Sequence, residues 1–518
     1  MYDAIIIGAG HNGLVTAAYL AKAGMQVLVL ERREQPGGTV ITETFGDSLR
    51  VDSVHAGGTL RPDIVKDLNL TSFGCPSFSG KSNLINVLSP TDRLVLSPDP
   101  SLASEAIKRF SEKDASRWPE FSAFMNRAAE FLDLVYATPM PRLPKKIRLS
   151  EGYSLFEMLF EFRLMGRKDM HAIIRMLPMS AVEFLDEWFE SDVLKATIAT
   201  IAIHHNTLGV MSPGTGYTLL HNWLNRGGLA HNNVGKAGEI TGGLARVVAA
   251  HGGEIRTNSH AAHIRVDNYS CKGIVLDSGE ELEARMVISA IDPKRTFLEL
   301  VGAVNLPPEF VWNVQSIKMR GSTAKMHLLL DRPLGAQQSA KAGQEQTTPH
   351  GGTTVIAPSL TILERAFDAT KYGRIPERPH LEITTNGKTA SITMQYAPFK
   401  LKDGSWQDHR AHLENLILTT LEEQFPNLHG SIVKQVSLTP QDLEDTYGLT
   451  EGDPNHGQLM LDQILFMRPI PGWSDHTTPV DGLYLGGSGV HGGGGVSGAS
   501  GRNAASTVSK IFKQNRLK

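Results

Sequence analysis

The chain contains 518 residues with a formal net charge of −3, and 41% of its residues are hydrophobic while 20% are charged. This balance is typical of globular proteins, and the length predicts two or three domains rather than one simple core. The absence of basic runs argues against nucleic acid as a partner. The two cysteines, Cys75 and Cys271, form no C-x-x-C pair, which excludes a redox-active disulfide of that type and a cysteine zinc cluster.

The first predicted element is a buried strand over residues 4–7, and a dinucleotide-binding pattern follows it. Gly8, Gly10 and Gly13 have the G-x-G-x-x-G spacing and precede a helical pattern. Gly8 permits a tight turn, Gly10 lets the backbone approach a pyrophosphate, and Gly13 lets the helix pack closely against the strand. The diphosphate is then expected at the helix N-terminus, where free N–H groups and the helix dipole favour an anion.

A second predicted strand, over residues 26–30, ends in Glu31, whose carboxylate is expected to accept hydrogen bonds from the adenosine ribose. Up to this residue the pattern serves NAD and FAD equally well. Gly37 and Gly38 then extend it in a way that resembles the FAD-binding amine oxidase and phytoene desaturase families. The complete series of strand, glycines, helix, strand, acid and Gly-Gly is much more specific than the glycine motif alone.

Helical periodicity dominates residues 101–225 and predicts a helical insertion there. A helix and short alternating strands follow Gly227 and Gly228, so we expect the nucleotide-binding domain to resume after them. A strand, a glycine-rich turn and a final helix close the chain. The predicted divisions are an FAD-binding domain over 1–75, 231–300 and 478–518, a helical domain over 76–230 and a sheet-based substrate domain over 301–477.

No apolar run reaches the roughly 18 residues that a membrane-spanning helix needs. The dinucleotide strand starts at residue 4, so we expect no cleavable signal peptide and a cytoplasmic or organelle-matrix protein. Residues 157–178 mix Met, Phe, Ile and Leu with Arg and Lys, as a membrane-surface or substrate-entry helix does. Such a stripe is more often simply core, so peripheral membrane contact stays an open alternative.

Beyond the nucleotide motif, six longer segments are informative: LRPDIVKDLNL, SPGTGYTLLHNW, VISAIDPKRTFLELV, HGGTTVIAPSLTILERAFDATKYG, LDQILFMRPIPGW and GLYLGGSGVHGGGGVSGASGRNAA. They resemble the phytoene dehydrogenase-related flavoproteins, and within them the pyridine nucleotide-disulphide oxidoreductase domain-containing protein 2 group. The resemblance implies an α/β fold of the amine oxidase and phytoene desaturase type. Such a fold has a discontinuous Rossmann-like FAD-binding domain, a mixed-sheet substrate domain and a helical insertion. This sequence lacks the cysteine pair that the group's name suggests.

The motif and the resemblance together define the predicted cofactor site. A strand matching residues 260–264 lies over the adenine in related flavoproteins, so Ala261 would contact the adenine through its backbone. Residues matching Gly487 and Ser488 meet the pyrophosphate and the ribityl chain there, and Val496, at the N-terminus of the last helix, would offer its N–H to the flavin C2 carbonyl. The predicted FAD-binding residues are Gly8, Gly10, His11, Asn12, Gly13, Glu31, Arg32, Gly37, Gly38, Thr39, Ala261, Gly487, Ser488 and Val496.

The C-terminal glycine turn departs from the family in one respect. The family usually has His-Pro-Gly, whereas this chain has His-Gly-Gly beginning at His491. His491 beside the flavin offers a position for a covalent link, although noncovalent FAD is the simpler expectation. Asp462, Gln463 and Arg468 fall in a segment shared with relatives, where they either belong to the site or form a network between domains.

A flavin supplies the redox chemistry itself, so few side chains are needed near its N5 atom. His204 and His205 lie in a segment that borders the substrate cavity in relatives, and His205 is the candidate base because an imidazole titrates near pH 6.5. Lys325 is the second candidate, on a strand that resembles the amine oxidase strand whose lysine holds a water against flavin N5. Alternation places Thr323, Lys325 and His327 on one face. The alternatives are a structural histidine at a helix end and a lysine that points to solvent or pairs with a carboxylate.

The motifs predict an FAD-dependent oxidoreductase, and the resemblance implies that it dehydrogenates or isomerises a largely apolar, carotenoid- or isoprenoid-like molecule. The alternatives are an amine oxidase-like enzyme acting on a C–N bond and a flavoprotein that mainly binds a partner or a membrane, since fold similarity does not fix a substrate. No second G-x-G-x-x-G follows a strand, so electrons are expected to pass to oxygen or a quinone. The sequence predicts no metal site and does not indicate the oligomeric state.

Overall fold

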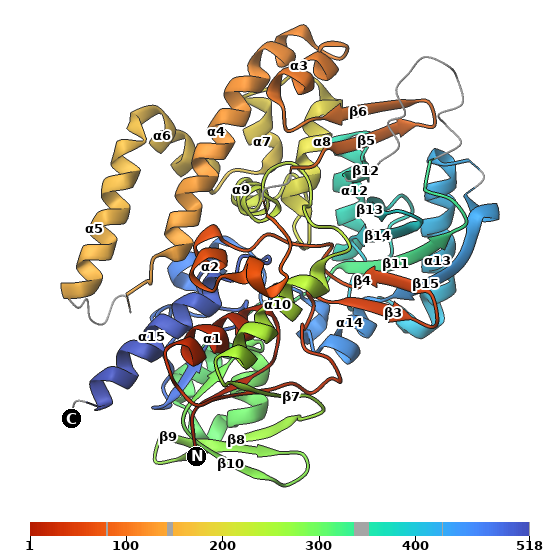
Figure 1. Ribbon diagram of the computed structural model, residues 1–518. Helices are drawn as coiled ribbons and strands as arrows, with labels where there is room; N and C mark the ends of the chain where they lie inside the picture. The colour runs from red at the N-terminus through yellow and green to blue at the C-terminus, as the bar shows by residue number, and fades with distance from the viewer. Residues whose placement is uncertain (79–80, 142–148, 336–351, 427, 517–518) are drawn as a thin grey trace.

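The structure is a computed structural model that describes residues 1–78, 81–141, 149–335, 352–426 and 428–516 (Figure 1). Two seven-stranded sheets carry the described part of the chain, and a group of helices lies beside them. The first sheet contains the nucleotide motif. The second contains the strand of Lys325.

The first sheet is the dinucleotide-binding sheet that the sequence predicts. Its strands are β7 (Glu254–Arg256), β2 (Val27–Leu30), β1 (Tyr2–Ile7), β10 (Glu281–Ser289), β9 (Ser270–Leu276) and β8 (Ala261–Asp267) in that order, with β16 (Leu483–Leu485) paired to β10. β1 runs parallel to β2 and β10, and β16 runs parallel to β10. Stretches far apart in the sequence therefore share one sheet, which confirms the discontinuous Rossmann-like fold.

Both faces of this sheet are covered, which explains the nearly uninterrupted apolar sequence of its central strands. Ala4 and Ile6 of β1 belong to a core with α1 (His11–Lys22), α10 (Ala237–Ala250) and α15 (Ala499–Arg516). Ile5 and Ile7 face the other way, into a core with β8, β9 and α11 (Pro308–Gln315). The short α2 (Pro62–Asp67) contributes Ile64 to the first of these cores.

The second sheet has the order β15 (Ile432–Leu438), β11 (Thr323–Leu330), β14 (Thr389–Gln395), β13 (His380–Asn386), β12 (Thr353–Ile356), β5 (Leu84–Ser89) and β6 (Asp92–Leu96). Neighbouring strands are antiparallel except β12 and β5, which are parallel. A small hairpin, β3 (Thr42–Phe45) and β4 (Leu49–Asp52), contacts β11 and β14 from the side of the first domain. The strand predicted around Lys325 is present as β11.

The strands β5 and β6 correct the prediction that residues 76–230 form a helical domain. They precede the helices in the chain but extend the second sheet through β12. Their apolar residues Ile85, Val87 and Val95 pack in the same core as that sheet and α13 (Trp406–Gln424). Burial against α13 therefore decides their place, and the helical layer begins only at α3 (Pro100–Lys108).

The two faces of the second sheet differ in chemistry. One face is apolar, and residues such as Met326, Ile383 and Ile392 pack with α13. The opposite face is polar although it is buried, and its residues are Thr323, Lys325, His327, His380, Glu382, Thr384, Thr393 and Gln395. Buried polar groups are costly unless they find partners, so a polar face inside the molecule indicates a site rather than a core. We call this set the polar wall.

The helical layer consists of α3, α4 (Glu112–Ala137), α7 (Ala181–Asp186), α8 (Asp192–Ile203) and α9 (Thr215–Arg226), joined by α12 (Leu360–Lys371), which contacts α8. Its core includes an aromatic group of Trp118, Phe121, Phe184 and Phe189. The hairpin of α5 (Leu149–Leu164) and α6 (Gly166–Met176) lies at the edge of this layer against α4 (Figure 1). The remaining α14 (Pro440–Tyr447) follows β15. Among the described helices, none combines the length and apolar character needed to cross a bilayer.

Candidate active site

A cavity opens where β1 and β2 end. Its wall includes Gly8, Gly10 and Glu31, which follow these two strands, together with Ala261 of β8 and Ser488 of the C-terminal turn. Parallel α/β sheets bind their ligands beyond the carboxyl ends of the strands. The cavity therefore joins residues from all three predicted stretches of the nucleotide-binding domain.

The glycines of the motif meet the steric requirements that the sequence predicts. A Cβ atom on Gly13 would lie 2.1 Å from the carbonyl oxygen of Gly8, so no larger residue lets α1 approach the turn so closely. A Cβ atom on Gly10 would meet nothing within 4 Å. The backbone at Gly10 therefore faces open space, as contact with a pyrophosphate requires.

Glu31 is buried beside the glycine turn. One carboxylate oxygen accepts the Ala9 N–H at 3.0 Å, and the other accepts the Arg33 N–H at 2.9 Å. These bonds fix the orientation of the carboxylate. A carboxylate offers about four lone-pair sites, so Glu31 has acceptor sites left, and its contact with the ribose hydroxyls stays a prediction.

Two histidines show that the cavity is suited to a polar ligand. His11 and His456 both line it, and Nε2 of His11 and Nδ1 of His456 are buried without a hydrogen-bond partner among the described residues. Burial lowers the pKa of each imidazole to about 4, so both are neutral at pH 7. The helix α1 begins at His11, and its N-cap Gly10 supplies no side chain to the first turn. Its free N–H groups fit the diphosphate of FAD.

Most of the predicted cofactor residues lie in the wall of this cavity. Those that line it are Gly8, Gly10, His11, Asn12, Glu31, Arg32, Gly38, Thr39, Ala261 and Ser488. Gly13, Gly37, Gly487 and Val496 are not among its lining residues. Gly37 donates its N–H to the carbonyl of Ala9, so it supports the turn from behind.

Val496 requires a correction, because it lies before the last helix rather than at its N-terminus. The helix α15 begins at Ala499, whose N–H donates to the Oγ of Ser497 at 3.3 Å. Gly498, with φ +75°, separates Val496 from the first helical residue. The N–H of Val496 donates to no other described residue, so its contact with the flavin C2 carbonyl stays a prediction.

The cavity also contains residues that sequence reasoning did not select. Arg295, Tyr447 and His456 all line it. Arg295 belongs to the segment VISAIDPKRTFLELV, so the resemblance gave a signal for it. Tyr447 and His456 come from the stretch assigned to the substrate domain, and no motif marked them.

Arg468 belongs to a hydrogen-bond network and is not one of the residues that line the cavity. It is buried, and its guanidinium donates to the carbonyl oxygens of Gly457 and Gln463 at 3.1 and 3.2 Å and of Ser488 at 2.8 Å. Asp462 lies at the surface in a 2.7 Å ion pair with Lys318. The interface alternative therefore accounts for this segment, because Arg468 holds the turn that carries Ser488.

His491 connects the C-terminal turn to α4. Its Nε2 lies 3.1 Å from the carbonyl oxygens of both Val135 and Thr138, and the residue is fully buried. A ring nitrogen between two carbonyl acceptors carries the proton, so Nε2 is a donor. These contacts give His491 a structural role, and the noncovalent binding of FAD stays the expectation.

Lys325 is only 2% exposed, so it does not point to solvent. Its ammonium donates to the Oγ1 of Thr393 on β14 at 2.7 Å. Burial lowers its pKa to about 8, while the negative charges of Glu382 and Asp52 oppose this decrease. Thr323 and His327 share its face of β11 and are buried as well, as alternation predicts.

His205 is buried next to other imidazoles. Its ring centroid lies 4.0 Å from that of His204 and 5.3 Å from that of His55. Its Nδ1 has no hydrogen-bond partner in the described part of the chain, and its backbone has a φ of +51°. Burial, followed by the charges of His204 and Lys325, holds the pKa of His205 well below its ordinary value. A free base is therefore present in this position, and its catalytic role stays a prediction.

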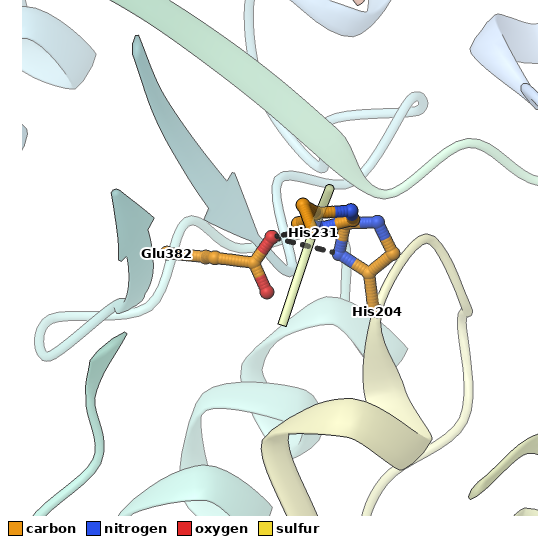
Figure 2. Close-up of side chains that lie close together, drawn as sticks. All are labelled: His204, His231 and Glu382. Carbon is orange, nitrogen blue, oxygen red and sulfur yellow. Dashed lines mark hydrogen bonds and ion pairs between the residues drawn. The ribbon is translucent and has the colours of Figure 1, made fainter. Parts of the chain in front are cut away.

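Glu382 of β13 is the centre of a group that the sequence did not predict (Figure 2). Its Oε1 lies 2.8 Å from Nε2 of His231 and 3.2 Å from Nδ1 of His204, and its Oε2 accepts from Arg226 at 2.7 Å. The histidines come from the end of α8 and the loop after α9, so no sequence motif joins them. Only the fold brings them to the polar wall.

A discontinuous Rossmann-like domain, a cavity suited to a dinucleotide and a second sheet with a buried polar face define a flavin-dependent oxidoreductase. The chain belongs to the family of flavin containing amine oxidoreductases, whose model matches residues 13–509. FAD is accordingly the cofactor, and the cavity residues above would hold it.

Three relatives extend the comparison over almost the whole chain. The chain is 33% identical to pyridine nucleotide-disulfide oxidoreductase domain-containing protein 2 of Rattus norvegicus, over 99% of this chain and 94% of the relative. It is 24% identical to a component of the limonene dehydrogenase of Castellaniella defragrans, over 99% and 95%. It is 22% identical to a lycopene-forming phytoene desaturase of Paracoccus, over 95% and 93%. The predicted resemblance is thus confirmed.

Solved structures show the same fold. An oxidoreductase from Methanosarcina mazei matches with a TM-score of 0.58 and 18% identity, over 98% of this chain and 99% of the other. Cyclohexylamine oxidase from Brevibacterium oxydans matches with a TM-score of 0.55 and 17% identity, over 99% of each chain. At these identities the likeness establishes the architecture and leaves the substrate open.

Proposed function

We propose that this FAD-dependent oxidoreductase dehydrogenates or isomerises a largely apolar, isoprenoid-like substrate. The observation that carries the proposal is the similarity, over 99% and 95% of the chain, to relatives named for limonene and phytoene. Both compounds are hydrocarbons. When bound, FAD takes a hydride from such a substrate, and the protein has to orient the C–H bond and exclude water.

The charges on the polar wall also favour a neutral substrate. Lys325 and Arg226 are buried cations in this region, and Glu382 is already engaged by Arg226 and two imidazoles. An incoming ammonium group would be repelled by Lys325 in a medium of low dielectric constant, and the one carboxylate of this group is not free to pair with it. A hydrocarbon has no such repulsion.

We further propose that α5 and α6 receive the substrate from a lipid surface. Phe156, Leu159, Phe160 and Leu164 of α5 are each between 51% and 66% exposed, and Ile174 of α6 is 55% exposed. Exposed apolar side chains on neighbouring helices are typical of peripheral membrane contact. A hydrocarbon substrate dissolves in the same phase.

Oxidation of a C–N bond is the second candidate function. The buried Lys325 favours it, because this lysine lies on the strand that resembles the amine oxidase strand. An ammonium at Lys325 would attract a water or hold negative charge that develops on the flavin. Oxygen would then be the natural electron acceptor, whereas a quinone fits the lipid-facing alternative.

An anaerobic substrate screen distinguishes the two candidates. The FAD-loaded protein is mixed with cyclic terpenes, acyclic isoprenoid hydrocarbons and primary amines, and loss of the visible flavin absorbance is recorded. We expect a hydrocarbon to reduce the flavin. Reduction by amines alone would contradict the hydrocarbon proposal.

A further inference from the structure

Glu382 stands at the end of a polar row across three neighbouring strands. Lys325 of β11 is directly opposite Thr393 of β14, and Thr393 is directly opposite Glu382 of β13. Directly opposite residues point to the same face of a sheet. The ammonium of Lys325 and the carboxylate of Glu382 therefore flank one threonine hydroxyl on the polar wall.

The histidines around Glu382 form a hydrogen-bonded group rather than a metal centre. The nearest ligand atoms of His204, His231 and Glu382 lie within 4.8 Å of one another, which is close enough for a divalent cation. However, Arg226 occupies the second carboxylate oxygen at 2.7 Å, and Lys325 lies on the same face. A buried dication would add two positive charges beside two cations, so hydrogen bonding satisfies this group better.

The charge of Glu382 determines which ring nitrogens carry protons. Burial opposes its ionisation, but Arg226, His204 and His231 together hold the pKa of this carboxyl group well below its ordinary value. An ionised carboxylate only accepts hydrogen bonds, so the nitrogens facing it, Nδ1 of His204 and Nε2 of His231, have to be the donors. In neutral imidazoles this leaves Nε2 of His204 and Nδ1 of His231 with free lone pairs.

Both imidazoles are slightly more exposed than the carboxylate between them. The side chains of His204 and His231 are 11% and 13% exposed, compared with 5% for Glu382. The two nitrogens with free lone pairs make no hydrogen bond to any described residue. The carboxylate is thus the most buried of the three groups, as is a buried acid that orients a histidine working as a base.

We propose that Glu382 is a positioning residue that fixes the tautomers of His204 and His231, so that one of their free nitrogens receives the proton that the substrate loses. This inference rests on the proposed function. In a dehydrogenation, one C–H bond gives its hydrogen and electron pair to FAD as hydride, and the neighbouring C–H bond gives its proton to the imidazole. The electron pair of that second bond forms the C=C bond. The resulting imidazolium lies beside the carboxylate of Glu382.

The surroundings of the two imidazoles suit this role. Burial, as the largest cause, holds the pKa of His204 well below its ordinary value and also lowers that of His231. The charged groups that oppose protonation are Arg226 and Lys325, and Glu382 favours it. Such imidazoles are weak bases, sufficient for a C–H bond that becomes acidic when the neighbouring carbon loses hydride.

Nitrogen NMR of the FAD-loaded protein with labelled histidines tests the positioning role without a substrate. The ring signals are assigned from His204→Gln and His231→Gln. We expect the Nδ1–H tautomer at His204 and the Nε2–H tautomer at His231, both lost or mixed in Glu382→Gln and restored in Glu382→Asp. Glu364→Gln, which alters a carboxylate bonded to the N–H of Met211, is the control and should change neither. The opposite tautomers, or tautomers unchanged in Glu382→Gln, would overturn the proposal.

Two further measurements complete the test. Zinc analysis should find no metal that depends on Glu382, and stoichiometric zinc that is lost in Glu382→Gln would overturn the hydrogen-bonded interpretation. With a reducing substrate, Glu382→Gln should slow flavin reduction by about 10²-fold at unchanged FAD affinity. An unchanged rate would remove the proton-transfer role. If no hydrocarbon reduces the flavin while the tautomers are as expected, the proposed function fails and the positioning of the rings stands.

Discussion

Glu31 holds the glycine turn in place through a single carboxylate. It holds the N–H groups of Ala9 and Arg33, and it lines the cavity where the ribose is expected. We predict that Glu31→Ala weakens FAD binding by about 1.5–3 kcal/mol, because hydrogen bonds to a charged acceptor are lost. Equilibrium titration of the apoprotein with FAD measures this, and Glu34→Ala, an exposed acid in the same loop, is the control. Equal affinities in the two variants would show that Glu31 does not contact the cofactor.

Lys325 gives a second prediction, on pH dependence. Because burial lowers its pKa to about 8, the ammonium predominates below this pH and is lost above it. If this charge assists oxygen reduction, reoxidation of the photoreduced flavin should slow as the pH rises through about 8. Stopped-flow mixing with oxygenated buffer tests this, and the pH step should be absent in Lys325→Met. The exposed Lys388→Met should behave like the parent protein, and a step that persists in Lys325→Met would assign the titration to another group.

The sequence predicted some residues of the candidate site and missed others. Gly13 was predictable because a local steric rule fixes it, and Lys325 was selected because its strand resembles the amine oxidase strand, with alternation giving only its face. Glu382 was not predictable, since its partners lie about 150 to 180 positions earlier in the chain and no local pattern connects them. His456 was missed because no motif marks it. Its unpaired nitrogen becomes informative only once the fold places it in the wall of the cavity.

At the scale of elements, α5 is the clearest candidate for contact with lipid. We predict that replacing Phe156 and Phe160 together by Ser weakens binding to neutral phospholipid vesicles, because two exposed aromatic side chains no longer enter the interface. Vesicle flotation measures the bound fraction. Trp312→Ser on α11 is the matched control, since Trp312 is 67% exposed on another part of the fold. Loss of binding in the control alone, or flotation of neither the parent protein nor the variants, would contradict a lipid-binding role of α5.

Elements were predictable where one period extends over a whole segment. The nucleotide motif predicts the strands β1 and β2 and the helix α1. Helical periodicity predicts α8 and α9. The strands β5 and β6 were missed, because their place depends on pairing with β12, more than 250 residues later. The start of α15 was placed too early, since Ser497 and Gly498 delay the helix beyond Val496.

On the scale of the whole molecule, each of the two sheets contributes a different part of the candidate site. The first sheet presents the cavity for the dinucleotide, and the second presents the polar wall with Lys325 and the Glu382 group. The hairpin of β3 and β4 links them through its contacts with β11 and β14. The side chain of Asp52 on β4 accepts the N–H groups of Gly57, Gly235 and Ala237 at 2.7 to 3.2 Å, which ties the hairpin to the first domain.

The central claim is that the cavity at the ends of β1 and β2 holds FAD. The most direct measurement is the visible absorption spectrum of the purified protein, followed by heat release and identification of the chromophore. We predict a flavin spectrum and stoichiometric FAD that is released without proteolysis, since binding is expected to be noncovalent. A protein that stays colourless after reconstitution with FAD, yet binds NADH tightly, would contradict the account.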